Sequence, residues 1–193
     1  HGGARCAHWA RTGCPHGATV SARSGTLAIF KVRTGRQTMA QEIERKFLLN
    51  SEAWRAHSDG GSVIMQGYLA NEKRCSVRIR VKGDTAWLTV KGPGINLTRA
   101  EFEYPIPLAD ACSMLADLAE RPFIEKTRHI VDHGPHRWEI DEFAGANAGL
   151  IVAEVELASV DEAFERPSWL GEEVSDDPRY LNAALVKIPY SEW

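Results

Sequence analysis

Long hydrophobic runs and regularly spaced cysteines are both missing from this chain of 193 residues. No stretch of about 18 apolar residues is present, so the sequence predicts no membrane-spanning helix. The four cysteines follow neither a metal-site spacing nor a disulfide framework, and we therefore expect a reduced, cytoplasmic protein. With 44% hydrophobic and 25% charged residues, the composition is that of an ordinary globular protein.

Acidic residues are absent from positions 1–38, whereas six basic residues lie there. Residues 39–193 consequently hold 17 basic residues against 26 acidic ones, a formal charge of −9. Such an acidic excess argues against general nucleic-acid binding and is compatible with bound metal cations. Strand patterning begins only after Met39. We therefore expect one folded domain over 39–193, a native start at Met39, and a disordered extension over 1–38.

Charged and apolar residues alternate along most of the expected domain. Side chains two positions apart on a strand share a face, so Glu42, Glu44 and Lys46 lie together on the first predicted strand. A further strand, at 62–70, is predicted from its apolar residues, and it brings the predicted total to eight. Six later segments repeat the charged pattern, with charges at Arg78 and Arg80, Lys91, Arg99 with Glu101 and Glu103, Lys126 and Arg128, Arg137 with Glu139 and Asp141, and Glu154 and Glu156.

Two interpretations of this charged face are open. Antiparallel sheets commonly turn a polar face to solvent, which would explain the alternation without any function. A solvated face, however, usually mixes in uncharged polar residues and alternates charge sign. Neighbouring carboxylates such as Glu42 and Glu44 repel one another unless a positive group lies between them. The second interpretation is therefore a functional, charged interior.

Few segments have a helical pattern. Ser51 is placed to cap a short helix, and residues 108–119 carry an apolar stripe at helical spacing. Asp177 followed by Pro178 predicts the start of a helix that runs through Leu185. The sequence shows no internal repeat and no second domain.

The Glu-x-Glu-x-Lys motif at 42–46 resembles the signature of the CYTH superfamily, also called the triphosphate tunnel metalloenzymes. The resemblance covers nearly all of 39–193, because the later charged motifs follow in the same order. Residues 171–182 resemble the C-terminal helix region of the short bacterial members. The implied fold is mainly β (α+β): an eight-stranded antiparallel closed barrel, or tunnel, with a charged interior, a few outer helices and a C-terminal plug helix.

The resemblance implies metal-dependent hydrolysis of a triphosphate, inorganic tripolyphosphate first, to pyrophosphate and phosphate. Hard divalent cations prefer carboxylate oxygen, and the implied cofactor is Mg²⁺ or Mn²⁺. Its implied ligands are Glu42, Glu44, Glu154, Glu156, Asp141, Glu139, Glu101 and Glu103. Cationic side chains suit phosphate oxygens, and the implied substrate-binding residues are Lys46, Arg78, Arg80, Lys91, Lys126, Arg128 and Lys187. The implied catalytic residues are Lys46, Glu44 and Glu156.

Two other functions are open at this point. One is a nucleotide-acting enzyme, such as a class IV adenylate cyclase or a nucleoside or thiamine triphosphatase. The other is a polyphosphate-binding module without turnover. In each case the expected partner is a small anionic triphosphate rather than nucleic acid or a membrane. Outward apolar residues such as Val77, Ile79 and Val81 need covering, in part by helices and further by a possible homodimer.

Overall fold

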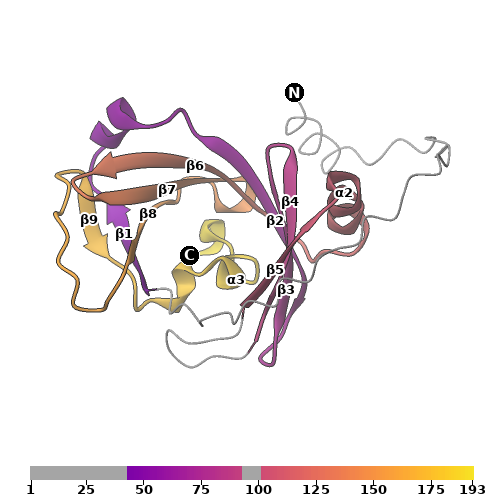
Figure 1. Ribbon diagram of the computed structural model, residues 1–193. Helices are drawn as coiled ribbons and strands as arrows, with labels where there is room; N and C mark the ends of the chain where they lie inside the picture. Colours follow the sequence, from indigo (N-terminus) through magenta and orange to yellow (C-terminus); the bar gives the residue numbers. More distant parts are fainter. Residues whose placement is uncertain (1–42, 93–100) are drawn as a thin grey trace.

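The structure is a computed structural model that describes residues 43–92 and 101–193, which form nine strands and a few short helices (Figure 1). The strands are β1 (Ile43–Leu49), β2 (Ser62–Asn71), β3 (Ser76–Lys82), β4 (Thr85–Lys91), β5 (Glu101–Ile106), β6 (Ile124–His133), β7 (His136–Ala144), β8 (Ile151–Leu157) and β9 (Leu170–Glu173). The helices are η1 (Ala53–His57), α2 (Leu108–Asp117), η2 (Gly145–Asn147), η3 (Pro178–Tyr180), α3 (Asn182–Leu185) and η4 (Tyr190–Glu192). The expectation of a mainly antiparallel β protein is confirmed.

All nine strands belong to one sheet, in the order β5-β4-β3-β2-β6-β7-β8-β1-β9. Every pairing is antiparallel, and most strands pair with a close neighbour in the chain. Figure 1 shows the sheet curving around the C-terminal segment. Within the described residues the ladder ends at β5 on one side and at β9 on the other, so it is an open, curved sheet there.

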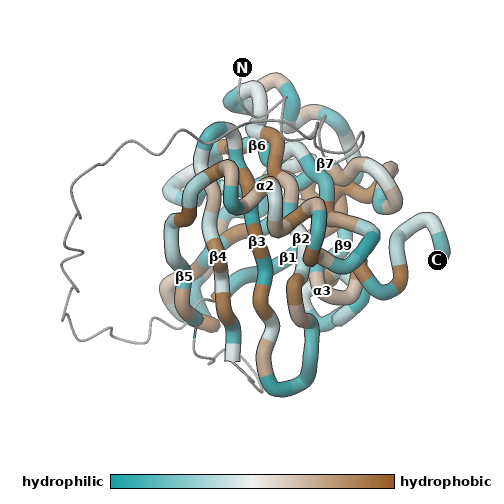
Figure 2. The backbone as a smooth tube through the Cα atoms, turned by 90° about the vertical axis from the view of Figure 1, so that its right-hand side faces the viewer, coloured by the Kyte–Doolittle hydropathy of each residue, from teal (hydrophilic) through white to brown (hydrophobic). Residues whose placement is uncertain are grey.

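Several charged side chains on the inner face of the sheet are shielded from solvent, as the interpretation of a charged interior predicts. On β3, Ile79 and Val81 are buried on the outer side, and hydrophobic and hydrophilic residues alternate along the strand (Figure 2). On the other side, the side chains of Arg78 and Lys46 are each only 13% exposed, and that of Arg128 is 15% exposed. A simply solvated face would leave such side chains open to water. The alternation therefore builds a charged interior.

Helix α2 covers the outer face of β2, β3 and β4. Its residues Ala111 and Leu115 are fully buried against Ile79 and Phe123. The contact is close at Gly67 on β2. A Cβ atom there would lie 2.7 Å from Leu115 Cδ2 and 2.8 Å from Ala119 Cβ.

We expect Gly67→Ala to destabilise the protein by about 1–3 kcal/mol, because overpacking forces side chains or backbone to move. Thermal and urea unfolding would measure the loss. In a Leu115→Ala background one clashing methyl is gone, so the added cost of Gly67→Ala should shrink. An unchanged unfolding midpoint for Gly67→Ala would contradict the close packing of α2 on β2.

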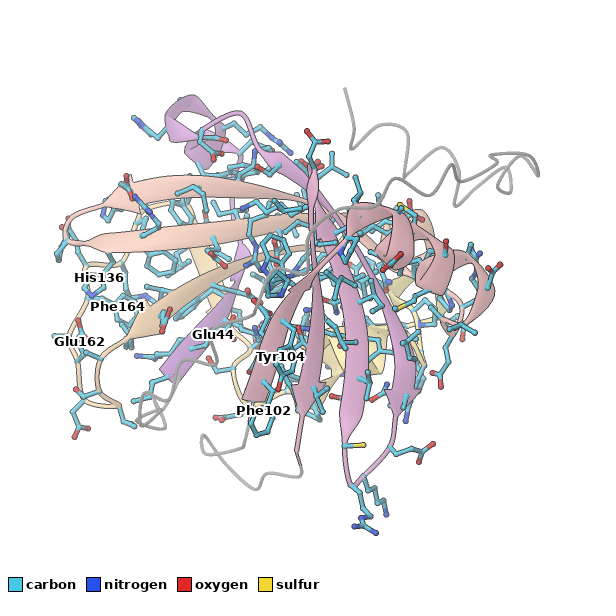
Figure 3. The ribbon with its side chains drawn as sticks, turned by 45° about the vertical axis from the view of Figure 1, so that its right-hand side comes forward. Glu44, Phe102, Tyr104, His136, Glu162 and Phe164 are labelled. Atoms are coloured by element: carbon cyan, nitrogen blue, oxygen red, sulfur yellow. The ribbon has the colours of Figure 1, made fainter. Side chains whose placement is uncertain are left out.

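A second core lies on the outer face of β1, β7 and β8. Phe47 and Trp138 are fully buried there, with ring centroids 5.8 Å apart. The segment after β8 packs over this core through Phe164, whose ring lies 5.6 Å from that of Trp138. The same segment is attached to β7 where His136 Nε2 lies 3.0 Å from Glu162 Oε1, and these residues cluster together in Figure 3.

The C-terminal segment fills part of the hollow of the sheet (Figure 1). Leu185 and Val186 are buried against Tyr68, Phe143 and Val152, which lie on the inner face. The end of β2 holds this segment, because Asn71 Nδ2 donates to the carbonyl oxygen of Ala183 at 3.0 Å. No helix in residues 43–92 or 101–193 has the length and apolar content needed to cross a bilayer.

Three helix and strand predictions need correction. The segment Leu170–Glu173, expected to lead into a helix, is a ninth strand, because it pairs with the free edge of β1. Asp177 does cap a helix, accepting from Arg179 N at 2.9 Å, but that helix ends at Tyr180 because Leu181 is extended. A separate α3 follows. Ser51 is not the cap of the first helix. Helix η1 begins at Ala53, so its N-cap residue is Glu52.

Candidate active site

Two neighbouring strands, β1 and β8, provide the acidic wall of the interior. Their register places Glu44 opposite Glu156 and Lys46 opposite Glu154. Lys46 Nζ donates to Glu44 Oε1 at 2.8 Å and also bonds to Glu154, so two carboxylates converge on one ammonium group. Glu154 is buried, whereas Glu156 is exposed. Figure 3 places Glu44 on the hollow side of the sheet.

Arg128 on β6 is the centre of a second ion-pair cluster. Its Nε donates to Asp141 Oδ1 at 2.7 Å, and its Nη2 lies 2.6 Å from Asp141 Oδ2 and 2.9 Å from Glu154 Oε2. Glu139 also bonds to this guanidinium, and Lys126 bonds to Asp141. Asp141 and Lys126 are almost completely buried. The cluster joins the acidic wall to the basic side chains of β6.

The basic wall lies on β3 and β4 and is partly neutralised by β5. Arg80 Nη2 donates to Glu103 Oε2 at 2.9 Å, and Lys91 Nζ lies 2.7 Å from Glu101 Oε2. Arg78 is less well paired. Its Nη2 is 4.0 Å from Glu101 Oε1, and its Nε is buried without a hydrogen-bond partner in the part of the chain that the structure describes.

The pKa shifts follow this division into two walls. Burial alone would lower the pKa of Lys46, but Glu154 and Glu44 outweigh burial and raise it. Burial would raise the pKa of Glu44, and Lys46 with other partners lowers it instead. For Arg80 the pKa is lowered, first by burial and then by repulsion from Arg78. Burial likewise lowers the pKa of Lys126 despite its contact with Asp141. A bound anion would offset both the burial of these two cations and the repulsion between Arg80 and Arg78.

Some of the charged residues singled out from the sequence are not part of these clusters. Glu42 lies outside the described residues, as does Arg99. Lys187 is exposed, and its Nζ donates to the carbonyl oxygen of Asn71 at 3.2 Å, which ties the C-terminal segment to β2. The structure brings all the other predicted site residues onto one face of the sheet.

Residues 43–92 and 101–193 contain no group of three or more His, Cys, Asp or Glu close enough to hold a metal ion by themselves. Magnesium, however, is usually held by one or two carboxylates, with substrate phosphates and water completing its shell. Glu44 and Glu154 already converge on a cation, the ammonium of Lys46. Two converging carboxylates are a donor set that suits a divalent cation.

Polar but uncharged interior residues escaped the sequence analysis. Thr89 is fully buried, and its Oγ1 donates to Glu103 Oε2 at 3.0 Å. Gln66 is buried too, and its Nε2 donates to Tyr68 Oη at 3.2 Å. Thr89 stands two positions before Lys91 and so shares its face, a signal that the charge pattern did not include.

The CYTH domain family matches residues 40–184. The chain is 44% identical over 155 residues to an inorganic triphosphatase of Acetivibrio thermocellus, covering 80% of this chain and 99% of that protein. It is 38% identical over 157 residues to an inorganic triphosphatase of Nitrosomonas europaea, covering 77% and 99%. A crystal structure of an inorganic triphosphatase superimposes with a TM-score of 0.57 at 35% identity, covering 77% of this chain and 95% of that one. The chain therefore belongs to the CYTH domain family.

Proposed function

We propose that this protein is an inorganic triphosphatase that hydrolyses tripolyphosphate to pyrophosphate and phosphate with a divalent metal ion. The observation that carries the proposal is the two-walled interior. Carboxylates of β1 and β8 lie on the same inner face of the curved sheet as arginine and lysine side chains of β3, β4 and β6 (Figure 1). The curated relatives named inorganic triphosphatase support the choice of substrate.

The basic wall suits a chain of phosphates. A triphosphate carries roughly four negative charges near neutral pH, and arginine forks match phosphate oxygens well. The buried Nε of Arg78, without a hydrogen-bond partner among the described residues, is a donor available to such an anion. Arg80, Lys91, Lys126 and Arg128 would supply further positive charge along the substrate. We propose that the ammonium group of Lys46, which bonds to Glu44 and Glu154, also contacts a phosphate oxygen and so links the two walls.

The acidic wall suits the metal. We propose Glu44 and Glu154 as its ligands, with Glu156 beside Glu44 in the β1–β8 register and Glu42 as a further candidate. A bound divalent cation would neutralise phosphate charge and lower the pKa of water. Mg²⁺ and Mn²⁺ both suit such oxygen donors, and Glu139, Asp141, Glu101 and Glu103 are secondary candidates. In the structure these four pair with basic side chains.

The proposed reaction is in-line attack of water on a terminal phosphorus atom. The bond from that phosphorus to its bridging oxygen breaks, and pyrophosphate leaves with the electron pair. The arginine and lysine side chains hold the three phosphates and stabilise the charge that develops on the leaving oxygen. The side chains of Arg78, Lys46 and Arg128 are at most 15% exposed, so water screens their electrostatic contacts less than at an open surface.

The substrate is tested by comparing phosphate release from tripolyphosphate, ATP and thiamine triphosphate, with cyclic AMP measured in the ATP reaction. We expect rapid, metal-dependent hydrolysis of tripolyphosphate, slower hydrolysis of the two substituted triphosphates, and no cyclic AMP. Cyclic AMP as the main product would identify a cyclase instead. Tight tripolyphosphate binding without turnover would identify a binding module.

Three further features belong to this proposal. We propose that the sheet closes into a tunnel when β5 and β9 are joined by residues or a partner around the substrate. We also retain a domain over 39–193 in a cytoplasmic protein that binds neither nucleic acid nor membrane.

Phe102 and Tyr104 are 45% and 53% exposed on the outer side of β5 (Figure 3). A homodimer that covers them would remove this apolar surface from water.

A further inference from the structure

Two neighbouring side chains, Glu103 and Trp87, restrict the orientation of the Arg80 guanidinium. Its Nη2 donates to both carboxylate oxygens of Glu103, at 3.1 and 2.9 Å. Trp87 lies opposite Arg80 across the β3–β4 ladder, and its ring centroid is 5.4 Å from Arg80 Cζ. These contacts restrict the guanidinium, whereas Arg78 two residues earlier has only a 4.0 Å contact with Glu101 among described residues. One arginine of the basic wall is thus pre-oriented and the other is not.

A buried hydroxyl in turn holds Glu103. Thr89 is opposite Glu103 in the β4–β5 ladder and is completely buried. Its Oγ1 donates to Glu103 Oε2, the same oxygen that accepts from Arg80. The Glu103 side chain is 34% exposed and would otherwise sample several rotamers in water. The bond from Thr89 favours the rotamer in which Glu103 meets Arg80.

We propose that Thr89 is a positioning residue, which acts on the bound triphosphate through Glu103 and Arg80. The inference rests on the proposed function and places Glu103 on the phosphate side of the site instead of the metal side. A guanidinium that is anchored through Nη2 keeps Nε and Nη1 for an anion. Pre-orientation lowers the entropy that binding must otherwise remove, so its loss should weaken phosphate binding.

The test compares Thr89→Val, which removes the hydroxyl, with Thr89→Ser, which keeps it. We expect Thr89→Val to raise KM for tripolyphosphate roughly tenfold, the scale of a lost hydrogen bond to a charged group. The value of kcat should change little, because binding is lost equally in the ground and transition states. Thr89→Ser should restore most of the wild-type KM. Calorimetry of tripolyphosphate binding without metal should show the same order of affinities.

Two controls separate positioning from other roles. In an Arg80→Ala background, Thr89→Val should have no further effect on KM, since both changes remove the same contact. Glu103→Gln, at an exposed edge strand, should raise KM without changing the metal concentration that gives half-maximal activity. A changed metal requirement would instead assign Glu103 to the metal and overturn the proposal.

Additive effects of Thr89→Val and Arg80→Ala would overturn it too, as would a raised KM in Thr89→Ser with an unchanged unfolding temperature. If Thr89→Val does not fold, the cycle is carried out with Glu103→Gln and Arg80→Ala. If the wild-type protein does not hydrolyse tripolyphosphate, the proposed function fails. The metal-free binding measurements then still decide whether Thr89 orients Arg80.

Discussion

Glu44→Gln is expected to lower tripolyphosphate turnover by roughly 10²- to 10³-fold, the range for losing one group that stabilises transition-state charge. Glutamine keeps the shape of the side chain but cannot supply the negative charge that a divalent cation needs. Steady-state phosphate release at saturating substrate and metal would measure the effect. Lys46 retains its contact with Glu154, so the unfolding temperature should fall only slightly.

The matched control is Glu142→Gln. Glu142 lies on β7 with the outer-face residues and pairs there with Arg55 at 2.9 Å. It should keep wild-type turnover, although it loses an exposed ion pair. If Glu44→Gln and Glu142→Gln both keep wild-type turnover, Glu44 has no part in holding the metal. If both variants lose activity together with their fold, charge loss alone is not the cause.

Arg78→Ala is expected to raise KM for tripolyphosphate roughly 10- to 100-fold, as for the loss of charged hydrogen bonds. The reason is its unsatisfied Nε, which has no hydrogen-bond partner among the described residues although it is buried. Such a donor is costly in the free protein and is satisfied when an anion arrives. The unfolding temperature of Arg78→Ala should therefore hold or rise while binding weakens. Calorimetric titration with tripolyphosphate and thermal unfolding would measure both quantities.

Arg137→Ala is the control for this change. The Arg137 side chain is 68% exposed and pairs with Asp132 near the β6–β7 turn. Its removal should leave KM close to the wild-type value. Equal losses of affinity in Arg78→Ala and Arg137→Ala would show that overall positive charge, and not the buried donor of Arg78, attracts the substrate.

The charged face of each strand could be predicted because strand side chains alternate with period two. Arg78 and Arg80 illustrate this, since their spacing alone placed them on one face. The partner of each charge was not predictable in the same way. Lys46 contacts Glu154, 108 positions away, and only the β1–β8 register brings the two together. A pattern within one strand contains no information on such a register.

The parts that sequence analysis missed depend on contacts made elsewhere in the fold. Strand β9 is four residues long and has no alternation, so it exists because the edge of β1 offers hydrogen-bonding groups. Lys187 was expected to bind substrate, but the structure shows it exposed and donating to Asn71, so a binding role for it stays a prediction. Thr89 is uncharged, and the sequence pattern gave it no role. Its importance is visible only in its burial and in its bond to Glu103.

Phosphorus-31 NMR of tripolyphosphate incubated with the full chain tests the central claim most directly. With Mg²⁺ or Mn²⁺ present, we predict that the tripolyphosphate signals disappear and that pyrophosphate and phosphate appear in equal amounts. With the metal removed by a chelator, the tripolyphosphate should persist. Tripolyphosphate that persists with both metals, or is consumed equally fast with the chelator, would contradict a metal-dependent triphosphatase.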